Sequence, residues 1–72
     1  MSDRFIKQFG RNIRKIREAR GMTQEALADA AGLHRTQISL IERGQRCVRL
    51  DTIEKLAVAL QVQPSDMIPS FD

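Results

Sequence analysis

The chain has 72 residues, of which 42% are hydrophobic and 29% are charged, and this composition indicates one small globular domain without room for a deep catalytic cleft. Its net charge of +3 is unevenly placed: residues 1–20 and 34–49 are basic whereas residues 21–33 and 50–72 are acidic, which suits a polyanion on one side of the molecule. The single cysteine, Cys47, permits no intramolecular disulfide and no run of about 18 apolar residues occurs, so we expect a cytoplasmic protein without a membrane partner.

Two helices are predicted in the first half of the chain. The first helix ends near Gly21. It carries one apolar stripe, which consists of Ile6, Phe9, Ile13 and Ile16. Thr23 is a good N-cap for the second helix, "QEALADAA", because its side-chain oxygen can accept a hydrogen bond from a free backbone amide. Gly32 closes this helix.

The third predicted helix runs from about Arg35 to Arg43 and has a thin buried side. Only Ile38 and Ile41 need to face inward, and Gly44 ends the helix because glycine readily adopts a positive φ. The residues free to project outward are Arg35, Thr36, Gln37, Ser39, Leu40 and Arg43. Hydrogen-bonding side chains therefore dominate the outer face of a short helix.

A fourth helix is predicted in "LDTIEKLAVALQV". Asp51 is expected to cap it, and its apolar stripe consists of Ile53, Leu56, Ala57 and Leu60. Pro64 begins one further turn, "SDMI", which Pro69 limits. No segment is predicted to be a strand, so the sequence predicts an all-α fold.

The second and third helices form a predicted helix-turn-helix. About three residues, including Gly32, join them, and the second helix of such a pair can enter the major groove of DNA. Arginine offers a bidentate fork to guanine O6 and N7, glutamine can pair with adenine, and a threonine methyl group can touch thymine. Each good pairing discriminates by about 1–3 kcal/mol. The predicted partner of residues 23–43 is therefore double-stranded DNA.

The run "MTQEALADAAGLHRTQISLIERGQR" resembles the helix-turn-helix of the lambda repressor and Cro group, also called the Xre family. The resemblance extends from about Phe9 to Ile68. It implies a compact five-helix bundle over residues 1–72, a single DNA-binding domain that binds pseudo-palindromic operators as a homodimer. The stretch "GLHRTQISLIERGQR" in so short a chain also resembles the small controller proteins of restriction-modification systems.

The resemblance implies DNA contacts position by position. Base reading falls on Arg35, Thr36, Gln37, Ser39 and Leu40. Leu40 departs from the polar residue common in phage repressors, and it either touches thymine or deoxyribose or reads no DNA. Contacts with the DNA backbone are implied for Thr23, Gln24, His34, Arg43, Arg46 and Arg49. For Thr23 and Gln24 the alternative is simple capping and solvation, with Gln24 also implied to brace the recognition helix.

Arg17 and Glu42 have a structural role in the resemblance. In relatives an arginine of the first helix pairs with the glutamate of "IERG" and ties the first helix to the end of the third. Breaking such a pair from one side costs about 3–5 kcal/mol when it is fully buried. We therefore expect this pair to orient the recognition helix without touching DNA.

A second copy of the chain is expected at the C-terminal segment, residues 58–71. One small reading head contacts too few base pairs to locate a single genomic site, so specificity favours two heads, with half-sites about 34 Å apart. The segment is acidic and thus kept off DNA, and its candidate dimer contacts are Val58, Val62, Met67, Ile68 and Phe71. The alternative for Met67 and Ile68 is closure of the monomer core.

The leading hypothesis is a transcriptional regulator that blocks or recruits RNA polymerase according to the position of its operator. The alternative is an antitoxin or adaptor that uses the same fold to hold a partner protein. No enzyme is expected, because His34 and Cys47 lie in a basic region without a carboxylate to orient them. No metal, cofactor or small-molecule ligand is expected either.

Overall fold

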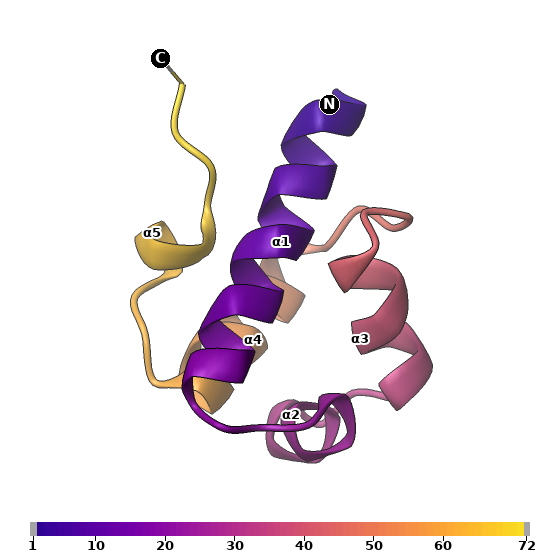
Figure 1. Cartoon of the computed structure of the whole chain (residues 1–72), viewed down its shortest axis with the longest axis vertical. Coiled ribbons are helices and arrows are strands. Elements are labelled where there is room, and N and C mark those ends of the chain that lie inside the picture. Colours follow the sequence, from indigo (N-terminus) through magenta and orange to yellow (C-terminus); the bar gives the residue numbers. More distant parts are fainter. Residues whose placement is uncertain (1, 72) are drawn as a thin grey trace.

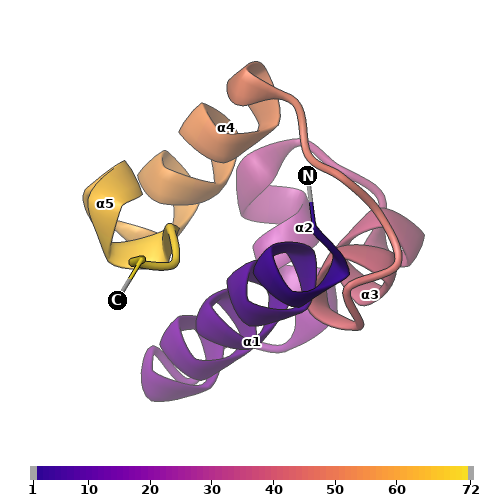
Figure 2. The ribbon, with the colours of Figure 1, turned by 90° about the horizontal axis from the view of Figure 1, so that it is seen from above.

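The computed structural model describes residues 2–71, which form five α-helices and no strand. The helices are α1 (Asp3–Ala19), α2 (Gln24–Ala31), α3 (Arg35–Glu42), α4 (Leu50–Leu60) and α5 (Pro64–Met67) (Figure 1). α1 packs against α3 and α5, and these two helices lie on opposite sides of it (Figure 1; Figure 2). Within residues 2–71 no helix has the length and apolarity needed to cross a membrane. The predicted all-α fold with five helices is confirmed.

The ends of α2 and α3 are where the sequence places them. The Thr23 side-chain oxygen accepts a hydrogen bond from the Ala26 backbone amide at 3.0 Å and so begins α2. Gly32 (φ 68°) and Gly44 (φ 68°) have left-handed backbones that turn the chain after α2 and α3. These two glycines limit the helix-turn-helix because a residue with a Cβ would be strained at either position.

α4 begins earlier than the predicted cap at Asp51 allows. Arg49 is the N-cap residue, and its carbonyl oxygen already accepts the first hydrogen bond, from the Ile53 amide at 3.1 Å. Asp51 lies inside the first turn, where its charge suits the positive end of the helix dipole and its side chain contacts Arg49. The prediction that Asp51 caps the helix is therefore wrong by two residues.

The core lies where α1 to α5 converge. Its members are Phe9, Ile13, Leu27, Ala28, Ala31, Ile38, Ile41, Leu56, Ala57, Leu60 and Met67. Met67 has no exposed surface, so it closes the monomer core and is not available to a second chain without unfolding α5. This corrects its assignment to a dimer interface, and the reason is that α5 is a single turn whose one buried residue is Met67.

α1 and α3 approach each other closely at Gly10, a residue that the sequence pattern does not single out. Gly10 is buried in the middle of α1. A Cβ at this position would meet the backbone carbonyl oxygens of Ile41 and Glu42, the latter at 2.8 Å. Because backbone atoms cannot move aside as a flexible side chain can, glycine here sets the distance between α1 and the end of α3.

Gly10→Ala should lower the free energy of unfolding by about 1–3 kcal/mol, the usual cost of overpacking a core. The sign of this change is informative, because in an exposed helix interior the replacement of glycine by alanine stabilises the protein by about 1 kcal/mol. Urea denaturation of both proteins measures the difference, with Lys15→Ala on the exposed side of α1 as the control. A stabilised Gly10→Ala protein would contradict the close approach of the two helices.

Candidate nucleic-acid interface

α2 and α3 form a helix-turn-helix whose second helix presents its outer face to solvent. Residues 32–34 join the two helices (Figure 1). α3 buries Ile38 and Ile41 against the core. On the outer face Arg35 and Thr36 are exposed, whereas Ser39 and Leu40 are half-buried. These four of the five residues predicted to read bases thus start from one continuous side of α3.

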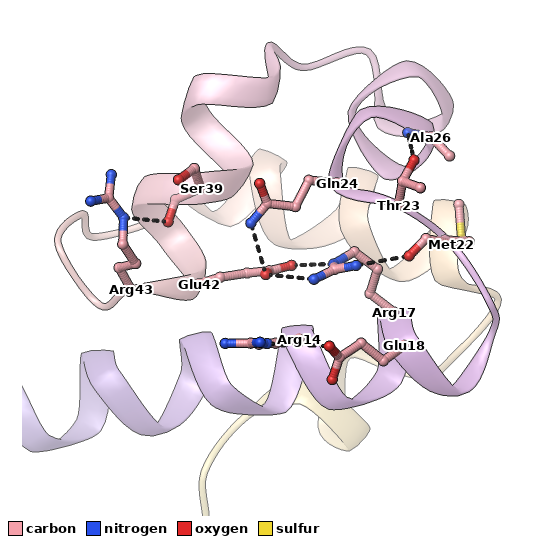
Figure 3. Close-up of polar contacts among 10 residues, drawn as sticks. All are labelled: Arg14, Arg17, Glu18, Met22, Thr23, Gln24, Ala26, Ser39, Glu42 and Arg43. Atoms are coloured by element: carbon pink, nitrogen blue, oxygen red, sulfur yellow. Dashed lines mark hydrogen bonds and ion pairs between the residues drawn. The ribbon is translucent and has the colours of Figure 1, made fainter.

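The C-terminal end of α3 is fixed to α1 by a buried ion pair. Arg17 donates from Nε to Glu42 Oε2 at 2.6 Å and from Nη2 to Glu42 Oε1 at 3.0 Å (Figure 3). The third guanidinium nitrogen, Nη1, donates to the Met22 carbonyl oxygen at 2.8 Å (Figure 3). The two side chains are only 10% and 3% exposed. The pairing expected from the resemblance is present, and the fork geometry gives α3 a fixed orientation.

The ion pair also fixes the charge of Arg17. Its hydrogen bonds to Glu42 raise the pKa of the guanidinium above the usual value, although burial acts in the opposite direction. Because an arginine pKa is already far above neutral, the contribution is lost only as the pH rises through this raised value. The pair therefore holds α3 throughout the physiological pH range.

Gln24 connects α2 to the same carboxylate. Its Nε2 donates to Glu42 Oε1 at 3.2 Å, and its side chain lies between α2 and α3 (Figure 3). Glu42 thereby receives hydrogen bonds from both α1 and α2. The bracing role of Gln24 matches the resemblance, while its contact with a DNA phosphate stays a prediction, as does that of Thr23, whose side chain caps α2.

The N-terminal end of α3 is held by a local hydrogen-bond pair that sequence reasoning missed. The His34 backbone amide donates to the Gln37 side-chain oxygen Oε1 at 3.0 Å, and the Gln37 backbone amide donates to the His34 carbonyl oxygen at 2.9 Å. The signal was present in the sequence, because a glutamine three residues after an N-cap is half of a capping box. His34 itself is exposed, with an extended backbone (φ −84°, ψ 147°).

The arginines around α3 differ in how free they are. Arg35 and Arg46 are exposed, and within residues 2–71 neither has a side-chain hydrogen bond or ion pair. Arg43 reaches back along α3, where its Nε lies 3.4 Å from the Ser39 carbonyl oxygen (Figure 3). Arg49 lies 3.3 Å from Asp51 in an exposed ion pair, so its charge is partly compensated, and its contact with the DNA backbone stays a prediction.

The predicted dimer contacts other than Met67 lie on α4, in the link after it and in the segment that follows α5. Val58 is 72% exposed and Phe71 is 90% exposed. Val62 and Ile68 are half-buried and pack against the core, so they offer less surface than the sequence suggests. Phe71 stacks on Phe5 of α1, with ring centroids 5.5 Å apart, a contact that the sequence did not predict.

Comparison with known proteins shows the protein family to which this helix-turn-helix belongs. Residues 13–67 match the family described as helix-turn-helix. The chain belongs to this family. The control protein C.BamHI of Bacillus amyloliquefaciens is 54% identical over 61 residues, which cover 83% of this chain and 75% of that protein.

Solved structures agree with the family assignment. The restriction-modification controller protein C.AhdI from Aeromonas hydrophila is similar with a TM-score of 0.86 and 43% identity, over 88% of this chain and 96% of that one. The restriction-modification controller protein C.Esp1396I is similar with a TM-score of 0.78 and 39% identity, over 82% of this chain and 77% of that one. The predicted membership and five-helix fold are confirmed, and these relatives are regulators, not enzymes.

Proposed function

We propose that this helix-turn-helix protein is a sequence-specific transcription regulator that reads DNA with the outer face of α3. The observation that carries this proposal is the fixed placement of α3. Its C-terminal end is tied to α1 through the Arg17–Glu42 pair, and its first turn is stabilised locally by the His34–Gln37 hydrogen bonds. A helix held in this way presents Arg35 and Thr36 to a groove at little entropic cost.

Phosphate contacts supply the part of the affinity that does not depend on sequence. Arg43 and Arg46 flank the end of α3 and are exposed, so each can neutralise a phosphate as DNA approaches. Such contacts release counterions, and binding therefore weakens as salt rises. Arg35, at the start of α3, is placed instead for the bidentate contact with guanine that distinguishes one base pair from another.

The similarity to controller proteins supports a narrower proposal. It extends over 96% of C.AhdI, so the resemblance covers nearly that whole protein and not one shared motif. We infer that this chain is a regulator of the same type, acting on a promoter by blocking or recruiting RNA polymerase according to where its operator lies. Footprinting upstream of the gene for this chain tests it, and protection of a two-fold repeated site is expected.

A homodimer is the expected binding form, with Val58 at its centre. The Val58 side chain is 72% exposed and is the most exposed apolar group among the predicted contacts on a helix. Dimers place two α3 helices on successive turns of DNA, about 34 Å apart. Each half then contributes its own base contacts to the total specificity.

Val58→Asp should convert the dimer to a monomer without unfolding it, because an exposed position tolerates a charge in the monomer but not in an apolar interface. Sedimentation equilibrium gives the dissociation constant, and we expect it to rise at least about tenfold, as for loss of one buried apolar anchor. Ala30→Asp, exposed on α2, is the control and should leave it unchanged. An unaltered dimer in Val58→Asp would place the interface elsewhere.

The function itself is tested by selecting bound sites from a pool of random double-stranded DNA. We expect enrichment of one pseudo-palindromic sequence, bound about 10³-fold or more tightly than random DNA of the same length. Recovery of unenriched DNA, or of none, would overturn the proposal of sequence-specific binding.

A further inference from the structure

We infer that Gln37 reads DNA through its amide NH₂ group alone and selects guanine on the strand it contacts. This inference rests on the proposed function, because it concerns how α3 reads a base. It departs from the usual pairing of glutamine with adenine, in which the side-chain oxygen accepts from N6 and the nitrogen donates to N7. The reason lies in what the Gln37 oxygen does within the protein.

The oxygen of Gln37 is engaged by the protein's own backbone. Oε1 accepts the His34 amide hydrogen at 3.0 Å. A backbone N–H can be paired only by an acceptor, so the orientation of the Gln37 amide is decided by its partner: oxygen toward His34 and NH₂ away from that bond. A second hydrogen bond, from the Gln37 backbone N–H to the His34 carbonyl oxygen at 2.9 Å, keeps the two residues together.

Keeping this bond is favourable when DNA is present. The His34 amide lies at the start of α3, where the helix itself supplies no acceptor for the first amides. Turning the Gln37 oxygen toward adenine would exchange one hydrogen bond for another and leave the His34 amide in need of a new partner. Gln37 is also half-buried, which limits the rotamers it can reach without moving away from α3.

A side chain that presents only donors matches a base edge that presents only acceptors. In the major groove guanine offers the acceptors N7 and O6 side by side, whereas adenine places an N6 donor beside its N7 acceptor. An NH₂ group directed at adenine therefore meets one acceptor and one competing donor. Discrimination in favour of guanine follows without any contribution from the Gln37 oxygen.

Two variants separate the capping oxygen from the reading nitrogen. Gln37→Glu keeps an oxygen for the His34 amide but removes the NH₂ donor, and Gln37→Met keeps the length of the side chain but removes both. The experiment repeats the selection from random DNA with the wild-type protein and both variants, and it measures their thermal unfolding. The ratio of specific to random DNA affinity is compared, because the added charge of glutamate weakens binding to all DNA.

At one base pair of the selected site, the wild-type protein should prefer guanine and both variants should have no preference. In both variants the ratio of specific to random DNA affinity should fall about tenfold. The melting temperature should fall in Gln37→Met but not in Gln37→Glu. Adenine at that base pair, or an equal fall in both melting temperatures, would overturn the inference, as would unchanged preferences at every position in the variants. Failure of the wild-type protein to select any sequence would instead contradict the proposed function, and the inference with it.

Discussion

Glu42→Ala should lower the free energy of unfolding by about 3–5 kcal/mol, because it leaves the Arg17 guanidinium buried without its carboxylate. The pair is joined by hydrogen bonds of 2.6 Å and 3.0 Å, and Glu42 is the less exposed partner at 3%. Domains of ordinary stability have only about 5–15 kcal/mol in total, so the loss is a large share. In a thermal scan the melting temperature should fall by more than about 10 °C.

A matched control is offered by a second ion pair on α1. Arg14 and Glu18 are 3.4 Å apart, but their side chains are 64% and 55% exposed (Figure 3). Glu18→Ala should therefore cost less than about 1 kcal/mol. The double variant Arg17→Met/Glu42→Leu should recover part of the loss, because no buried charge is left unpaired. Equal effects of Glu42→Ala and Glu18→Ala would contradict the structural role given to the buried pair.

Arg35→Ala should reduce discrimination between the selected operator and random DNA by about 1–3 kcal/mol per half-site, or about 5- to 150-fold. Arg35 is exposed at the first position of α3, and its guanidinium is not engaged by another side chain within residues 2–71. Binding curves for both DNAs at one salt concentration measure the ratio. Folding should be unaffected, because the Arg35 side chain does not pack in the core.

Arg43→Ala serves as the contrasting variant. It should weaken binding to operator and random DNA alike and make the slope of log affinity against log salt shallower by about 1 for each phosphate that is no longer neutralised. Arg35→Ala, in contrast, should change mainly the ratio of the two affinities. If Arg43→Ala altered the ratio and Arg35→Ala only the slope, the two assignments would have to be exchanged.

Much of the fold follows from a few positions whose chemistry is local. Thr23 begins α2 through its own hydroxyl, and Gly32 and Gly44 follow the ends of helices because they adopt a positive φ. These helix ends could therefore be predicted without knowledge of the rest of the molecule. The outer face of α3 was equally predictable, since only Ile38 and Ile41 are needed to bury the inner one.

The remaining features depend on contacts between segments far apart in the sequence. Nothing in the sequence pattern singles out Gly10, because its role depends on the backbone of α3 that lies against it. Met67 could belong to a core or to an interface until α5 was placed, and it has no exposed surface. The Arg17–Glu42 pair spans 25 residues and came from family resemblance, because spacing alone does not indicate it.

Titration of the ¹⁵N-labelled protein with the selected operator shows whether DNA lies against the outer face of α3, because the backbone amide resonances near bound DNA shift. The largest changes should fall on Arg35, Thr36, Ser39 and the loop containing Arg46, and those of α5, on the opposite side of α1, should be small (Figure 1). Changes concentrated in α4 and α5, with α3 unaffected, would show that DNA binds to a different face of the protein.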